Sequence, residues 1–153
     1  MRIDSDALWG AARRLERHDE QLDVLGDEHT LVAYALSLAS DTAIDALPLC
    51  TFVELSLLSR RIRDSNDWEG FWERRERECT SRATAVALTA TAQLLGHAQA
   101  GEVAFPSSPD SKVGSTARQL VAGLTGDLTE LQRKRVAFAC YEWPEPLCVA
   151  WWR

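Results

Sequence analysis

Residues 83–95, ATAVALTATAQLL, are the most informative stretch of this chain for its fold. The stretch contains no charged residue and consists mainly of small and apolar side chains. It continues a stripe that recurs every three, four or seven residues, formed by Trp68, Trp72, Cys79, Ala83, Val86, Ala90 and Leu94. This spacing predicts one long helix from about residue 68 to residue 95, capped by Asp67. Small side chains let neighbouring helices approach closely, so we expect residues 83–95 in the middle of a helical bundle.

The segments on both sides also show helical periodicity. Residues 29–39, HTLVAYALSLA, are apolar nearly all round, which is typical of a helix buried on most sides. Further helices are predicted from a cap at Asp4 or Ser5 to Gly26, over 49–63, over about 116–124, and from a cap at Asp127 to Pro144. Residues 100–115, AGEVAFPSSPDSKVGS, are expected to form a long loop. No segment alternates convincingly as a strand, so we predict an all-α fold, a single-domain compact bundle of five to seven helices over 1–153.

Composition places the chain among ordinary globular domains. Its 153 residues are 46% apolar and 26% charged. No apolar run reaches the roughly 18–20 residues of a membrane-spanning helix, and the first residues lack the apolar stretch of a secretory signal. A cytoplasmic protein without membrane contact is therefore expected, and the excess of Arg over Lys is typical of high-GC bacterial genomes.

The sequence lacks the motifs of several familiar chemistries. The four cysteines, Cys50, Cys79, Cys140 and Cys148, form no zinc-type spacing, so we expect reduced, buried thiols. No nucleophile elbow, phosphate-binding glycine loop or helical Glu-x-x-His pair is present. The triplets at 18–20 and 27–29 are rich in ligand-type side chains, but neighbouring helical residues point about 100° apart. We therefore expect no metal, no cofactor and no catalytic residues.

One carboxylate leaves two interpretations open. Glu54 stands within an apolar stretch, TFVELSLL, and a buried carboxylate with a raised pKa would suit acid–base chemistry. The favoured alternative places it on the single solvated edge of its helix, because acids are rarely buried without a partner. An enzyme of unfamiliar type that uses Glu54 or His97 is the third-ranked functional hypothesis.

The net charge of −6 arises entirely within residues 1–45, which hold ten acids and four arginines. The candidate partner-binding residues in this region are Glu16, Asp19, Glu20, Asp23, Asp27 and Glu28. On the predicted first helix, residues 16, 19 or 20, 23 and 27 share one face. That face is either merely solvated, as most charged faces are, or a docking strip for a basic protein.

Two tryptophans close to the last residue are the second candidate for partner binding. Trp151 and Trp152 must either dock on this domain or be offered to a partner, because a terminus is disordered unless something holds it. Trp68 and Trp72, in contrast, lie on the apolar stripe and are expected in the core.

These features favour a non-enzymatic protein-binding module. Its most concrete form is a small acidic inhibitor of the immunity-protein or antitoxin type, which masks a basic partner. The alternative is a structural or assembly subunit of a larger, ribonucleoprotein complex that uses the arginine clusters at 60–63 and 74–77. Nucleic-acid binding is the less favoured interpretation, since those arginines alternate with acids. The oligomeric state does not follow from the sequence.

Overall fold

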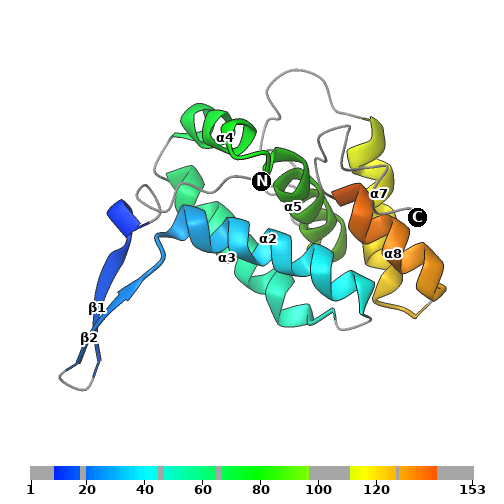
Figure 1. The fold of residues 1–153 in the computed structure, drawn as a ribbon, viewed down its shortest axis with the longest axis horizontal. Helices are drawn as coiled ribbons and strands as arrows, with labels where there is room; N and C mark the ends of the chain where they lie inside the picture. The colour runs from blue at the N-terminus through cyan, green and yellow to red at the C-terminus, as the bar shows by residue number, and fades with distance from the viewer. Residues whose placement is uncertain are drawn as a thin grey trace, which may run out of the picture.

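The computed structural model describes residues 9–17, 20–44, 47–64, 67–96, 111–126 and 128–140. Within them the chain forms six helices and one two-stranded hairpin (Figure 1). The elements are β1 (Arg13–Arg17), β2 (Glu20–Val24), α2 (Asp27–Ala43), α3 (Leu49–Asp64), α4 (Trp68–Arg77), α5 (Ser81–Leu95), α7 (Ser111–Gly123) and α8 (Glu130–Cys140). The predicted all-α bundle is confirmed, and the hairpin is an addition to it.

Helix α5 is the centre of the bundle, as residues 83–95 predicted. It packs against α2, α3, α4, α7 and α8. Ala85, Val86, Ala87 and Leu88 are all buried, so four consecutive residues face neighbouring helices. The core cluster draws residues from all six helices. Small side chains allow this enclosure because a helix of larger residues would keep its neighbours further away.

Buried hydroxyl groups in the core bond to their own helices. The Oγ1 atoms of Thr42, Thr84 and Thr91 donate to the carbonyl four residues earlier, at 2.7, 2.9 and 2.7 Å. A buried hydroxyl without a partner costs about 1–3 kcal/mol, so these bonds allow threonine to act as a small core residue.

The single helix predicted over 68–95 is wrong, because the chain turns between α4 and α5. Cys79 adopts the left-handed conformation, with φ 55°, and is exposed rather than on the apolar stripe. The amide of Thr80 bonds to the carbonyl of Arg75 at 2.9 Å, which closes the turn. Helix α4 therefore leaves the direction of α5 and lies across the top of the bundle in Figure 1.

The helix predicted from Asp4 or Ser5 to Gly26 is also wrong. Trp9 and Gly10 are helical, but residues 13–17 and 20–24 form the antiparallel hairpin. Leu15 and Leu22, assigned to a buried helix face, lie opposite each other across the strands and are half exposed. Among the described residues, neither leucine belongs to the core cluster or packs against it, so the helical spacing of apolar residues here did not indicate burial.

The boundaries of the last two helices differ from the prediction. Helix α7 begins at Ser111, inside the predicted loop, whose residues 100–110 lie outside the described residues. The cap of α8 is Thr129 rather than Asp127. Its Oγ1 accepts from the Gln132 amide at 3.3 Å, and Gln132 Oε1 accepts from the Thr129 amide at 2.8 Å. This reciprocal pair is a capping box.

The aromatic and thiol predictions are partly confirmed. Trp72 is buried in the core and Trp68 packs partly buried against it. Cys140 is buried as expected, whereas Cys50 and Cys79 are exposed; Cys148 lies outside the described residues. Within the described part of the chain, no helix has the length and apolar character needed to cross a membrane.

Candidate partner-binding surface

The hairpin is an arm that projects from one end of the bundle, beside the start of α2 (Figure 1). Its two strands pair from Arg13 with Val24 to Arg17 with Glu20. At its centre the cross-strand pair Leu15–Leu22 is 51% and 48% exposed. Each leucine is therefore about half covered, and the rest of the pair forms a small apolar surface on a charged arm.

A bidentate ion pair fixes the arm to the bundle. Arg13 Nη2 and Nη1 donate to the two carboxylate oxygens of Asp27, at 2.6 and 3.2 Å. Near this ion pair, the backbone at Gly26 lies close to the backbone at Ala11. A Cβ on Gly26 would lie only 2.6 Å from the carbonyl oxygen of Ala11. Asp27 therefore has two structural roles. It binds Arg13 of the arm, and its negative charge in the first turn of α2 interacts favourably with the positive end of the helix dipole.

The six acids of the predicted strip do not share one helix face. Glu16 and Asp23 lie on the hairpin, where Asp23 accepts from Arg14 Nε at 3.2 Å. Asp27 and Glu28 begin α2 and are paired with arginines of the bundle. Glu20 lies in β2. Asp19, Trp151 and Trp152 lie outside the described residues.

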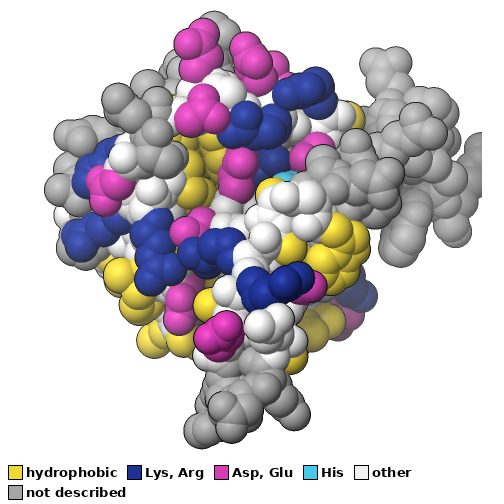
Figure 2. Space-filling model, turned by 90° about the vertical axis from the view of Figure 1, so that its left-hand side faces the viewer, with side chains coloured by type: hydrophobic (Ala, Val, Ile, Leu, Met, Phe, Trp, Pro, Cys, Tyr) yellow, Lys and Arg dark blue, Asp and Glu magenta, His cyan; other side chains and the backbone are white. Residues whose placement is uncertain are grey.

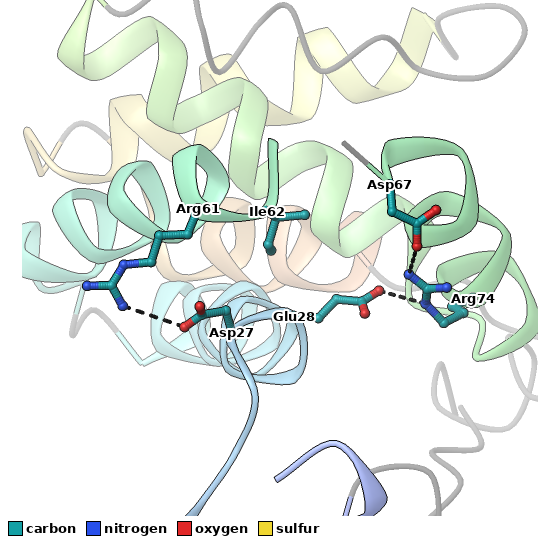
Figure 3. Close-up of a pocket in the computed structure, with 6 residues that line it drawn as sticks. All are labelled: Asp27, Glu28, Arg61, Ile62, Asp67 and Arg74. Carbon is teal, nitrogen blue, oxygen red and sulfur yellow. Dashed lines mark hydrogen bonds and ion pairs between the residues drawn. The ribbon is translucent and has the colours of Figure 1, made fainter. Parts of the chain in front are cut away.

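Next to the arm, a pocket of about 220 Å³ lies between α2, α3 and α4 (Figure 3). It is lined by Asp27, Glu28, Arg61, Ile62, Asp67 and Arg74. Arg74 lies between two carboxylates, donating from Nε to Glu28 at 2.9 Å and from Nη2 to Asp67 at 2.8 Å. Its hydrogen bond holds the pKa of the Asp67 carboxyl below the usual value. Arg61 approaches Asp27 at 3.6 Å, so both arginines of the pocket are engaged by carboxylates.

Behind Glu28, Arg75 is fully buried. Its Nη2 atom lies 3.0 Å from Glu78 Oε2 and 3.9 Å from Glu28 Oε1, and its guanidinium lies over the Phe71 ring. Burial lowers the pKa of this guanidinium, and the two carboxylates offset part of that effect. Nε and Nη1 have no hydrogen-bond partner among the described residues. The two carboxylates therefore offset part of the free-energy cost of burying this charge in the core.

Four of the six arginines in the clusters at 60–63 and 74–77 lie within 4 Å of a carboxylate. Arg74, Arg75 and Arg61 are paired with acids, and Arg63 lies 3.8 Å from Asp64. Figure 2 shows basic and acidic side chains interspersed over this end of the molecule. The local field is mixed, so neither sign of charge dominates this face.

The remaining residues that the sequence singled out are Glu54 and His97. Glu54 is exposed, which confirms the solvated-edge interpretation of that carboxylate. His97 lies outside the described residues. No group of three or more potential metal ligands occurs within the part of the chain that the structure describes. A second apolar surface runs along α3, where Leu49, Val53 and Leu57 are exposed four residues apart.

Sequence reasoning missed the hairpin, the most distinctive feature of this surface. One signal was available: the segments RRLER and EQLDV are separated by two residues, and antiparallel pairing places Arg14 opposite Asp23, Leu15 opposite Leu22 and Arg17 opposite Glu20. Oppositely charged and apolar cross-strand pairs of this kind stabilise an antiparallel pair.

Comparison with protein-family models, with curated proteins and with solved structures finds no match for the chain.

Proposed function

We propose that this protein is a non-enzymatic protein-binding module and that the hairpin is its docking element. The observation that carries the proposal is the exposed Leu15–Leu22 pair on an arm that projects from the bundle. Covering these side chains removes apolar surface from water, which is favourable by about 25 cal/mol for each Å². A partner gains this contribution without disturbing the core, because the arm supplies no residue to the core cluster.

In its finer form, the protein is a small acidic inhibitor of the immunity-protein or antitoxin type, which masks a basic partner. The net charge of −6 supports this form, since exposed carboxylates attract a cationic protein over roughly 8–10 Å. The arm's sequence, 13–24, contributes four of the candidate acids, Glu16, Asp19, Glu20 and Asp23. Asp27 and Glu28, in contrast, are engaged within the molecule, and their part is to hold the arm and the pocket in place.

A capture experiment with matched variants tests the proposal. The immobilised full chain is incubated with lysate of its source cells, and the retained proteins are identified by mass spectrometry. Leu15→Ser/Leu22→Ser changes the arm, whereas Val53→Ser/Leu57→Ser changes an equally exposed surface on α3, where the side chains are 48% and 47% exposed. We expect a basic protein that is retained by the wild type and the α3 variant but lost with the arm variant.

The capture experiment and an activity assay together separate the competing functions. A partner lost with the α3 variant and kept with the arm variant contradicts the role of the hairpin. Retention of RNA together with several proteins favours the assembly-subunit alternative. Turnover of a small molecule by the purified chain contradicts the non-enzymatic proposal.

A further inference from the structure

We infer that the partner binds by adding one basic β-strand to the outer edge of β2, which turns the hairpin into a three-stranded sheet. This inference rests on the proposed function, because it specifies the chemistry of the partner and the way in which it docks. It is argued from the register of the hairpin and from the different charges of its two edges.

Both strands have an outer edge that no other described strand pairs with. Only two residues, 18 and 19, connect the strands, so Arg17 and Glu20 form the hydrogen-bonded pair nearest the connection. The alternation of an antiparallel ladder then directs the backbone groups of Gln21 and Asp23 away from β1. These groups are available to a third strand, which is the principle of recognition by strand addition.

The two edges differ in charge. The β1 sequence, RRLER, has three arginines and one acid, whereas the β2 sequence, EQLDV, has two acids and no base. A cationic strand is therefore attracted to the edge of β2 and repelled by the edge of β1. Like charges directly opposite each other destabilise a strand pair, and unlike charges stabilise it.

The hairpin itself shows which side chains suit β2. On its inner side, β1 places Leu15 opposite Leu22 and Arg14 opposite Asp23, where Arg14 Nε lies 3.2 Å from Asp23 Oδ1. An incoming strand meets the same two positions from the other side. The matching segment has an apolar residue next to an arginine or lysine, so that the leucine pair becomes a three-residue apolar row.

A second copy of this chain fits the edge poorly. Pairing of its β1 in the antiparallel register of the hairpin would place the two bundles side by side only two strands, about 10 Å, apart. One helix alone is about 10 Å wide, and the bundle holds several helices side by side (Figure 1). Pairing of β2 with β2 about a two-fold axis joins two acidic strands. Parallel pairing of β1 with β2 that keeps Leu15 beside Leu22 places Glu16 beside Asp23, which are like charges. The edge therefore suits a strand from another protein.

The test uses the full chain and a defined probe, the labelled peptide AARRLER, which has the sequence of residues 11–17. Its binding is followed by fluorescence anisotropy at low salt. The control peptide AARRPER keeps the charge but cannot form a regular strand. Gln21→Pro removes the outward amide of β2, and Glu16→Pro, directly opposite in the register, removes the outward amide of β1. Circular dichroism and a thermal melt verify that both variants keep the bundle.

We expect AARRLER to bind the wild type and Glu16→Pro equally within about twofold, and Gln21→Pro at least tenfold more weakly. The control peptide should bind the wild type at least tenfold more weakly than AARRLER. Equal binding of the two peptides, no binding of AARRLER, unchanged binding by Gln21→Pro, or a dimer of the free chain in sedimentation overturns the inference. The proposed function is judged separately: a captured partner that needs Leu15 and Leu22 but tolerates Gln21→Pro leaves it standing while strand addition fails.

Discussion

At the scale of single residues, Glu28 connects two parts of the bundle. It accepts a hydrogen bond from Arg74 at 2.9 Å and lies 3.9 Å from the buried Arg75. These contacts join the start of α2 to α4, and the Glu28–Arg74 hydrogen bond links residues 46 positions apart in the chain. The acid belongs to the strip predicted for partner binding, yet its surroundings give it a structural task.

Replacement of Glu28 tests that task. Glu28→Gln should lower the free energy of unfolding by about 1–3 kcal/mol, since it leaves Arg75 buried with one carboxylate fewer. The pair is partly solvated, which keeps the loss below that of a fully buried ion pair. Urea denaturation measures the difference. Asp23→Asn, which removes an exposed partner of Arg14, is the control and should change stability by less than about 0.5 kcal/mol. A larger effect of Asp23→Asn than of Glu28→Gln would contradict this account.

The cysteines should differ sharply in reactivity. Burial raises the pKa of the Cys140 thiol to about 12, so at pH 8 only about one molecule in ten thousand carries the reactive thiolate. Cys50 and Cys79 are exposed. Brief treatment of the native chain with a maleimide, followed by peptide mapping, should label these two and spare Cys140. Labelling of Cys140 at the same rate would show that α8 opens readily, and denaturant should abolish the difference.

At the scale of elements, the turn between α4 and α5 depends on one residue with an unfavourable backbone conformation. Cys79 has φ 55°, a region that costs an L-residue roughly 1–2 kcal/mol and glycine almost nothing. Cys79→Gly should therefore raise the free energy of unfolding by about 1 kcal/mol. The same change in a helix, Cys50→Gly in α3, should instead lower the free energy of unfolding by roughly a few tenths of a kcal/mol. Loss of stability in Cys79→Gly would mean that the cysteine side chain contributes contacts that outweigh the strain.

The helices of the bundle could be predicted because their apolar residues follow the period of a helix and meet a core. Residues 83–95 and 29–39 carry that information in their own composition. The turn at Cys79 could not be predicted, since the stripe of Trp72, Ala83 and Val86 continues at helical spacing through it. Local periodicity indicates which side chains face the core. It does not show a turn between two helices when the apolar residues on both sides of the turn still face the core.

The candidate site was predicted only in its chemistry. The acids of residues 16–28 were found from charge alone, and their arrangement followed from a helix that does not exist. Leu15 and Leu22 are seven residues apart, which suits two turns of a helix as well as a cross-strand pair. The pairs of Asp27 with Arg61 and of Glu28 with Arg74 show that these two acids are engaged within the molecule, and no local sequence pattern encodes such long-range pairs.

At the scale of the whole molecule, the structure divides into a bundle that holds the apolar core and an arm that holds none of it. An isolated two-stranded hairpin is marginally stable in water, because its few cross-strand contacts barely offset the entropy of ordering the chain. Here Arg13 and Asp27 attach only the base of the arm. The arm should therefore open locally much more often than the bundle unfolds.

Amide hydrogen exchange of the full chain measures this division directly. Amides in the middle of α5, such as those of Val86 and Leu88, should exchange only on global unfolding, since these residues are fully enclosed. The inward amides of Leu15 and Leu22 should exchange orders of magnitude faster, through opening of the arm, and the outward amides of Gln21 and Asp23 fastest of all.

A core variant provides the control. Leu88→Ala, which should lower the free energy of unfolding by about 2–5 kcal/mol, should accelerate exchange in α5 and leave exchange in the arm unchanged. Arm amides as protected as those of α5 would show instead that the hairpin is already paired or packed in the free protein. Selective slowing at Gln21 and Asp23 when a partner is added would locate the new strand at the edge of β2, because only a hydrogen-bonded neighbour on that side shields those two amides.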